Sequence, residues 1–354
     1  MARLSVNCSG WPVICRLLAA ICLLSAAECA WAGDDGDDRI RTCAEGWRRN
    51  RESFHFATAK LRVTSGLVKS IEDAKAGKFT SDGVHDPVTT IANWLYDGPL
   101  FCCTESCKGM VETVTKPQGP RGMAPCWSKL YLSDGTYRME VFVEPKAGSI
   151  GDSRKSRNGN WGYENSPFSM AMMGGNEYLN PSHEIVQARA KQLPVKFQGQ
   201  LDMEGRRAEV VTVDHGPYGL TRYYFDPSRG YLVSRIDHTA SSKQGIDLTG
   251  LLVEARECSR GRWFPTRVVQ SQGRYLTTKL LGVWCIEVLE LDVDHPPKPE
   301  AFALDLQQGL LISASEEPSA HFRLKAERRV AAKDLAGLCD ETLKHKLPRA
   351  KPLR

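Results

Sequence analysis

Apolar and polar residues alternate most regularly between residues 207 and 293, where five such runs follow one another. Between the runs stand sequences typical of turns, with Gly or Pro where the backbone reverses: residues 226–230, 241–245, 260–261 and 272–273. Strict alternation is the pattern of a strand whose two faces meet different surroundings. The stretch therefore predicts an antiparallel meander in which each strand pairs with the next.

The part of the chain before the meander mixes helical and strand patterns. Apolar residues recur at helical spacing over residues 40–54, and residues 54–63 then alternate as a first strand. Short helices are predicted over residues 68–78 and 87–96, the second because Asp86 and Pro87 suit the first two positions of a helix. Three further elements are predicted: a hairpin of residues 127–132 and 136–143, a helix over 180–193, and a last strand within 302–312.

Both faces of the predicted meander are apolar, so something must cover each of them. We therefore expect an α+β fold in which one strongly curved antiparallel sheet is covered by helices on one face and by helices or a ligand on the other. If the turns at 260–261 and 272–273 contain two residues each, one face carries the large apolar residues that we take as candidate ligand-binding residues: Leu252, Trp263, Val269 and Trp284.

Residues 1–32 have the pattern of an export signal. Arg3 and Arg16 form its cationic flank, residues 17–27 its apolar core, and Ala30-Trp31-Ala32 a small-x-small cleavage site. We expect cleavage after Ala32 and a periplasmic or otherwise extracytoplasmic location.

The rest of the chain is expected to form a single domain over 33–315 and a basic, helical C-terminal tail over 316–354, which is solvated and loosely docked. No later segment is apolar over the roughly 20 residues that a transmembrane helix needs.

Charge and cysteine content narrow the class of protein. The formal net charge is +5, and removal of the two cations and one anion of the signal leaves +4, which does not indicate nucleic-acid binding. An even number of cysteines remains, as is usual for exported proteins with disulfides. The tightest group lies in a Cys-rich insertion at about 97–127 and supplies the disulfide candidates, with a zinc knot or free thiols as alternatives: Cys102, Cys103, Cys107 and Cys126.

No catalytic motif is present in the sequence. Four neighbouring pairs of an acid and an imidazole occur, three of them at predicted strand ends: His85-Asp86, Asp214-His215, Asp237-His238 and Asp294-His295. Neighbours in a strand point to opposite faces, so the two members of a pair cannot act on one ion or one substrate. We therefore expect no catalytic residues, no bound metal and no cofactor. A metal site assembled from several of these imidazoles is the alternative.

Three segments resemble the outer-membrane lipoprotein-sorting proteins and their LolA/LolB-like relatives: Tyr223-Tyr224-Phe225-Asp226-Pro227-Ser228-Arg229-Gly230-Tyr231-Leu232, Gly261-Arg262-Trp263-Phe264-Pro265-Thr266, and Phe302-Ala303-Leu304-Asp305-Leu306 before Gly309. The resemblance covers mainly residues 207–312. It implies an incomplete antiparallel β-barrel with helices in or over its concave face, and a hollow that holds acyl chains. The matching motifs are scaffold positions, so no ligand-binding residue carries over from the family.

The leading hypothesis is an exported, non-enzymatic carrier or binder of a lipid or an acylated protein, held by its acyl chains in an apolar concavity. The alternative is an envelope sensor or protein-interaction module that grips a protein partner with the same scaffold. A hydrolase or a metal-dependent enzyme is the third hypothesis.

Overall fold

The computed structural model describes residues 35–80, 86–108, 110–114, 121–125, 128–144, 146–152, 181–239, 247–259, 261–274, 280–317 and 319–345. The expected export signal, His85, Cys126 and the turn at 241–245 lie outside these residues. The described helices are α2 (Asp35–Glu52), α3 (Ile71–Lys75), α5 (Pro181–Ala190) and α6 (Leu335–Lys344), with 3₁₀ turns η2 (Gly216–Tyr218), η3 (Pro227–Arg229), η4 (Pro299–Ala301) and η5 (Ala332–Asp334).

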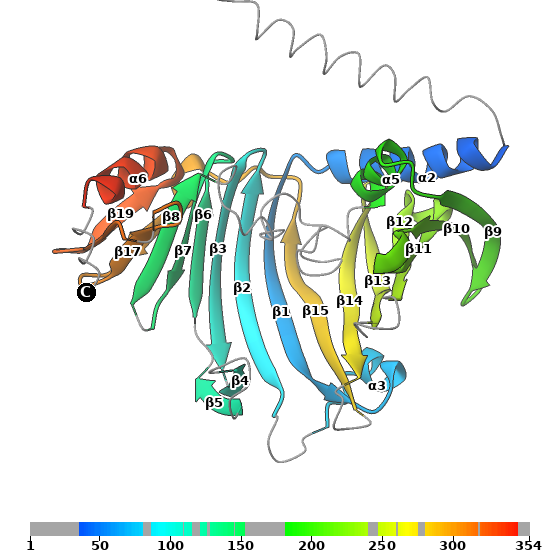
Figure 1. Cartoon of the computed structure of the whole chain (residues 1–354), viewed down its shortest axis with the longest axis horizontal. Helices are drawn as coiled ribbons and strands as arrows, with labels where there is room; N and C mark the ends of the chain where they lie inside the picture. The colour runs from blue at the N-terminus through cyan, green and yellow to red at the C-terminus, as the bar shows by residue number, and fades with distance from the viewer. Residues whose placement is uncertain are drawn as a thin grey trace, which may run out of the picture.

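One wide sheet dominates the described part of the chain (Figure 1). Its strands, from one edge to the other, are β18 (His321–Arg323), β17 (Leu311–Ala314), β8 (Ala147–Asp152), β7 (Tyr137–Phe142), β6 (Lys129–Ser133), β3 (Leu100–Lys108), β2 (Val88–Asp97), β1 (Phe56–Val68), β15 (Leu281–Asp292), β14 (Arg262–Arg274), β13 (Asp247–Ser259), β12 (Leu232–Thr239), β11 (Leu220–Asp226), β10 (Arg206–Asp214) and β9 (Val195–Met203). Two small sheets pair β16 (Ala303–Leu306) with β19 (Arg328–Ala331) and β4 (Met110–Val114) with β5 (Arg121–Pro125).

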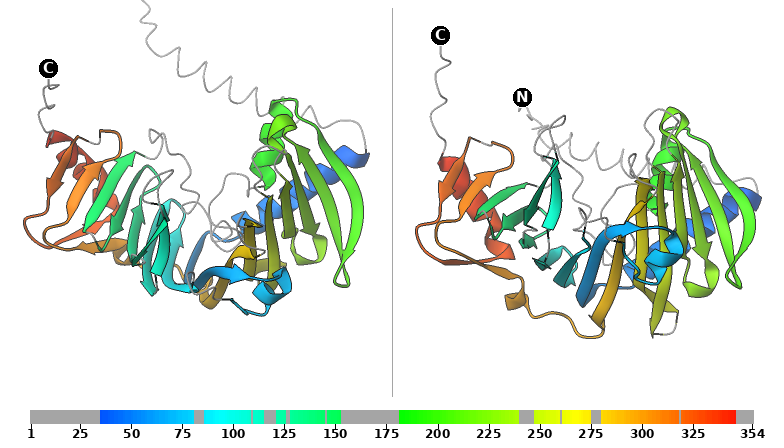
Figure 2. Two further views of the ribbon diagram at one scale, coloured as in Figure 1. Left: turned by 60° about the horizontal axis from the view of Figure 1, so that its bottom comes forward. Right: turned by 90° about the horizontal axis from the view of Figure 1, so that it is seen from below.

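The main sheet is strongly bent, with both ends rising toward the same side (Figure 2). All pairs of neighbouring strands are antiparallel except β17 and β8, which are parallel. A sheet this wide cannot remain open and flat, because strand twist accumulates until the sheet curls. The predicted fold class, an α+β fold built on a curved, incomplete barrel with helices on its concave face, is confirmed.

Most predicted elements of the N-terminal half are present, but the second predicted short helix is wrong. Residues 87–96 form strand β2, paired with β1 on one side and β3 on the other. The run Val88-Thr89-Thr90-Ile91 consists of β-branched residues, whose stiff side chains favour a strand over a helix. Residues 68–78 contain only the single helical turn α3, because β1 continues to Val68.

The meander contains one strand more than the sequence predicted, and one of its turns lies elsewhere. The first run divides into β10 and β11 around the turn at η2. The turn predicted at 272–273 is wrong, because β14 extends to Arg274 and pairs with a β15 that begins at Leu281. The turn at 260–261 separates Ser259 from Arg262, which pair directly, so that prediction is confirmed.

A continuous apolar core covers one face of the sheet from β6 to β10, which we call the inner face. Helices α2 and α5 pack on it, mainly against β9, β10 and β12, so their end of the concave face is filled by the protein itself. Ile40, Cys43 and Trp47 are the buried side chains of α2. Gly46 allows the closest approach, because a β-carbon there would overlap the ring of Tyr231.

The C-terminal segment forms a second core on the opposite, outer face of β3, β6, β7 and β8. Helix α6 agrees with the predicted helical tail. The segment is not solvated as expected, because Leu335 and Leu338 are completely buried against this core. Phe302 and Ile312 join it from the segments that precede the helix. A third, small cluster places Ala74 of α3 on the outer face of β14 and β15.

No helix within the described ranges is long and apolar enough to cross a membrane.

Leu338→Ala should reduce the free energy of unfolding by about 2 to 5 kcal/mol, because it leaves a cavity in the second core. Chemical denaturation followed by circular dichroism measures the change. The matched control is Leu201→Ala, at a leucine that is 51% exposed, which should change stability by less than about 0.5 kcal/mol. A C-terminal segment that contributes nothing to the fold would instead give equal, small effects for both variants.

Candidate functional site

The structure brings only some of the candidate ligand-binding residues together. Leu252 and Trp284 both lie on the inner face, the first buried and the second 36% exposed. Val269 lies on the outer face, in the small cluster with Ala74. Trp263 lies at the start of β14, where its backbone N–H donates to Asn50 Oδ1 at 2.9 Å and its carbonyl accepts from Asn50 Nδ2 at 3.0 Å.

Val269 lies on the outer face, and not on the inner face with Leu252 and Trp284, because of the register in which the strands pair. Leu252 pairs with Val268, not with Val269, because irregularities in the β13–β14 ladder shift the pairing by one residue. The late turn between β14 and β15 likewise pairs Val269 with Cys285 rather than with an inner-face residue. Because side chains in a strand alternate, each shift of one residue moves a side chain to the other face.

The middle of the inner face is apolar and carries no charge. We call this patch the central inner surface; alternation from the register assigns to it Gly250 and Leu252 of β13, Val268 and Gln270 of β14, Trp284, Ile286 and Val288 of β15, Leu61, Val63 and Ser65 of β1, and Thr90, Ala92 and Trp94 of β2. None of these residues is charged. Helices α2 and α5 pack mainly beyond this patch, toward β9, β10 and β12.

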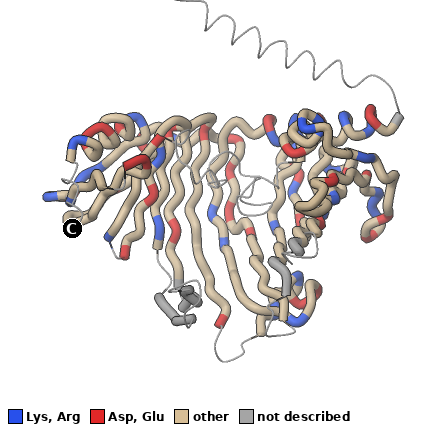
Figure 3. Tube along the Cα trace, in the orientation of Figure 1, with Lys and Arg blue, Asp and Glu red and all other residues tan. Residues whose placement is uncertain are grey.

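The outer face of the same strands carries ion pairs instead. Lys60 Nζ lies 3.1 Å from Glu290 Oε1, Arg62 Nη1 lies 3.4 Å from Glu287 Oε2, and Arg267 Nη1 lies 3.6 Å from Glu254 Oε1. Acidic and basic positions accordingly lie close together along the central strands (Figure 3). These pairs are partly exposed and contribute little to stability. They place the charged side chains in the middle of these strands on the outer face.

Gln270 is the polar residue of the central inner surface that is fully buried, whereas Ser65 and Thr90 are partly exposed. It is 1% exposed, and neither its Nε2 nor its Oε1 has a hydrogen-bond partner. Among the described residues, no other buried side chain lacks a partner for both a donor and an acceptor atom. Each unpaired buried polar group costs about 1 to 3 kcal/mol. The sequence did not single out Gln270, because a glutamine beside Ser271 and Gln272 looks like an ordinary turn.

Two of the imidazoles named from the sequence meet in a buried polar cluster beneath α5. Glu184 Oε1 of α5 lies 2.6 Å from His215 Nε2. Thr221 Oγ1 of β11 is completely buried and lies 2.9 Å from His215 Nε2, 3.0 Å from His238 Nδ1 and 3.2 Å from Glu184 Oε1. Burial raises the pKa of the Glu184 carboxyl, although the hydrogen bond from His215 lowers it again in part. We call these four residues the Glu184 cluster.

The acids beside these histidines point away from the cluster, as strand alternation predicted. Asp237 accepts hydrogen bonds from Arg235 and Tyr224 on the outer face, and Asp214 lines an outer depression. His295 lies apart, exposed and 3.1 Å from Asp292. Within the described ranges, no group of three or more His, Cys, Asp and Glu side chains has the geometry to hold a metal ion. The cluster joins α5 to the sheet, and no signal in the sequence pointed to Glu184 or Thr221 as its members.

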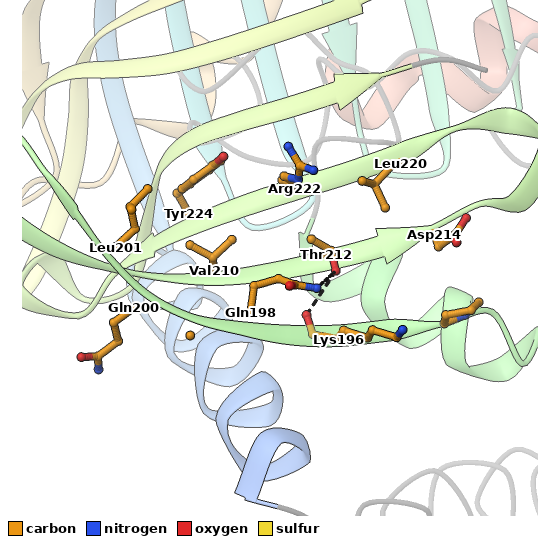
Figure 4. Close-up of a pocket in the computed structure, with 12 residues that line it drawn as sticks. Lys196, Gln198, Gln200, Leu201, Val210, Thr212, Asp214, Leu220, Arg222 and Tyr224 are labelled. Carbon is orange, nitrogen blue, oxygen red and sulfur yellow. Dashed lines mark hydrogen bonds between the residues drawn. The ribbon is translucent and has the colours of Figure 1, made fainter. Parts of the chain in front are cut away.

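The outer depression lies on the face of β9, β10 and β11 opposite α2, and has a volume of about 450 Å³ (Figure 4). Its wall mixes apolar side chains, including Leu201 and Val210, with Lys196, Arg222 and Gln198. Gln198 Nε2 donates to Thr212 Oγ1 at 3.0 Å, across the floor of the depression. Charged side chains in its wall make it poorly suited to an acyl chain.

The cysteine candidates divide between free and bonded residues. Cys102 and Cys103 are free thiols in the central strand β3, so they do not form the expected staple. Cys102 belongs to the outer core and Cys103 to the inner core. Burial raises the pKa of the Cys102 thiol to about 11 and that of Cys103 well above its ordinary value, which keeps both protonated and unreactive. Cys107 is disulfide-bonded.

Peptide mapping without reduction should recover Cys107 in a cross-linked peptide, and Cys126 is the remaining disulfide candidate named from the sequence. Cys102 and Cys103 should be alkylated only after the protein is denatured, because both are buried. Mass spectrometry of alkylated digests makes the distinction. A cross-link that contains Cys102 or Cys103 would contradict the assignment.

The stability difference between the wild type and Glu184→Gln should depend on pH. A carboxyl whose pKa is raised in the folded state favours folding below its unfolded pKa, and this contribution is lost as pH rises through the folded pKa. The wild type should therefore lose stability relative to Glu184→Gln as the pH rises above about 4.5, the ordinary pKa of a glutamate carboxyl. Thr221→Val removes a hydrogen bond that lowers the Glu184 pKa, so its decline over the same range should be steeper. Denaturant titrations at several pH values measure both slopes, and a pH-independent difference would refute the assignment.

The sequence matches no protein-family model, and no curated protein is significantly similar to it. Three solved structures align with the chain at 10% sequence identity. They are a DUF1329 family protein from Desulfovibrio piger (TM-score 0.43, covering 74% of this chain and 96% of that one), a putative outer membrane lipoprotein-sorting protein domain from Vibrio parahaemolyticus (0.42, 73% and 94%) and a LolA superfamily protein from Nitrosomonas europaea (0.37, 73% and 94%).

Proposed function

We propose that this protein is an exported, non-enzymatic binder or carrier of a lipid or an acylated protein, whose acyl chain lies on the central inner surface. The observation that carries the proposal is the difference between the two faces of the same strands. Their outer face carries Lys, Arg and Glu in ion pairs, whereas their inner face carries aliphatic and aromatic side chains and no charge. Helices α2 and α5 pack at one end of this face, yet its apolar side chains continue past both helices to β6.

The energetics of an acyl chain suit this surface. Apolar area removed from water stabilises a complex by about 25 cal/mol per Å², so one long chain supplies most of the binding free energy without directional contacts. Trp284 is the exposed large apolar side chain of the central inner surface, and an indole offers a broad face for packing against methylene groups. Such a surface selects for chain length and apolarity rather than for one chemical structure.

An extracytoplasmic location is part of the proposal. It rests on the export-signal pattern of residues 1–32 and agrees with the disulfide at Cys107, because disulfides persist in oxidising compartments. The same surroundings hold lipoproteins and lipids in transit. The proposal leaves the outer depression at β9–β11 without a role in lipid binding, since its wall is charged.

Ser65→Lys should weaken binding of a fluorescent fatty-acyl probe by at least about tenfold, because it places a charge in the middle of the central inner surface. The matched control is Thr64→Lys, the neighbouring position on the outer face of the same strand, which should leave the affinity unchanged. Fluorescence titration measures both variants, and lipid extraction with mass spectrometry identifies material that purifies with the wild type. Purified protein that carries no lipid and ignores acyl probes would refute the function.

A further inference from the structure

The side-chain amide of Gln270 is buried at the middle of β14 and has no hydrogen-bond partner. Its side chain belongs to the inner face, since Gln270 pairs with Gly250 of β13 on one side and with Trp284 of β15 on the other. Gly250 contributes no side chain and is itself buried. Trp284 is partly exposed, so the surface next to Gln270 reaches solvent.

We propose that the Gln270 amide binds the uncharged polar end of the ligand, an acyl ester or acyl amide with a free hydroxyl group, while the chain lies on the apolar residues around it. This inference rests on the proposed function and names the chemical class of the ligand. The amide can donate through Nε2 and accept through Oε1, and both atoms are unpaired. A carbonyl beside a hydroxyl offers the complementary pair of groups.

The absence of charge around Gln270 decides against an ionised head group. Val268, Ile286 and Leu252, its diagonal and same-strand neighbours on the inner face, are aliphatic and buried. The nearest cations on these strands, Arg62 and Arg267, extend from the outer face and are paired with Glu287 and Glu254. A phosphate or carboxylate placed at Gln270 would therefore lose its hydration without gaining a counter-ion, and an uncharged ester would lose much less.

Gln270 separates two parts of the inner face that differ in their surroundings, and this determines where a bound acyl chain would lie. Toward one side the central inner surface continues over β15, β1 and β2 through Ile286, Val63 and Ala92. Toward the other it meets Leu252 and then the core beneath α2 and α5. The apolar strip that an acyl chain would contact therefore runs from Gln270 toward β2, with the polar end held at β14.

The experiment compares 1-monooleoylglycerol with oleate at pH 8, both below their critical micelle concentrations, as competitors of N-phenyl-1-naphthylamine fluorescence in the full-length mature protein. The two lipids share the acyl chain and differ in whether the head is neutral or ionised. Wild-type protein should bind the neutral lipid at least about tenfold more tightly. Gln270→Met, which keeps the length of the side chain and removes its hydrogen bonds, should abolish this preference.

The control is Gln198→Met, the same substitution at an exposed glutamine of the outer depression, which should keep the wild-type preference. Thermal unfolding of each variant verifies folding, and Gln270→Leu serves as a second variant if the methionine variant unfolds early. Equal affinities of wild-type protein for the two lipids, or a preference that survives both Gln270 variants, would overturn the inference and leave the proposed function standing. Wild-type protein that binds neither lipid nor the probe would instead refute the proposed function itself.

Discussion

The alternation of side chains across paired strands is the constraint on which the rest of this structure depends. Once β14 pairs with β13 and β15 in the observed register, Val268 and Gln270 must face the hollow while Val269 and Ser271 face outward. The same alternation applies to β1 and β2, which pair in turn, and it places Lys60 and Arg62 on the outer face. A single register thus separates a charged exterior from an uncharged interior over five neighbouring strands.

A sheet of this width also needs support on both faces, and the chain supplies it at opposite ends. Helices α2 and α5 cover the inner face near β9 to β12, and the C-terminal segment with α6 covers the outer face near β3 to β8. The adjacent residues Cys102 and Cys103 mark the overlap, because one belongs to each core. The remaining described helix, α3, packs on the middle strands β1, β14 and β15, but on their outer face.

The sequence was sufficient to predict the curved sheet, its helices at residues 40–54 and 180–193, and the hairpin around Asp134, because these depend on local periodicity and turn chemistry. It failed where the outcome depended on pairing partners. Residues 87–96 have an acceptable start for a helix, but β1 and β3 offer hydrogen bonds on both sides of an extended chain. The face of Val269 was wrong because irregular pairing in β13 and a late turn after Arg274 cannot be read from composition.

Part of the site was beyond sequence analysis for a related reason. Leu252 and Trp284 were recognisable, since large apolar residues in a strand mark a buried or binding face. The histidines of the Glu184 cluster were noticed as dipeptides, but Glu184 lies about thirty residues earlier, on a helix, and only folding brings its carboxyl within 2.6 Å of His215. Gln270 gave no signal, because what distinguishes it is the lack of a partner, a property of its surroundings and not of the residue.

The identity of that residue agrees with a site that must exist both empty and filled. A charged anchor at the centre of an apolar hollow would cost far more than an amide whenever no ligand is bound, and an aliphatic residue would hold no polar group in place. A neutral side chain with both a donor and an acceptor is the strongest polar anchor that the hollow can contain while it is unoccupied. The unpaired amide of Gln270 and the uncharged residues around it agree with the proposed ligand, which brings its own hydrogen bonds and no charge.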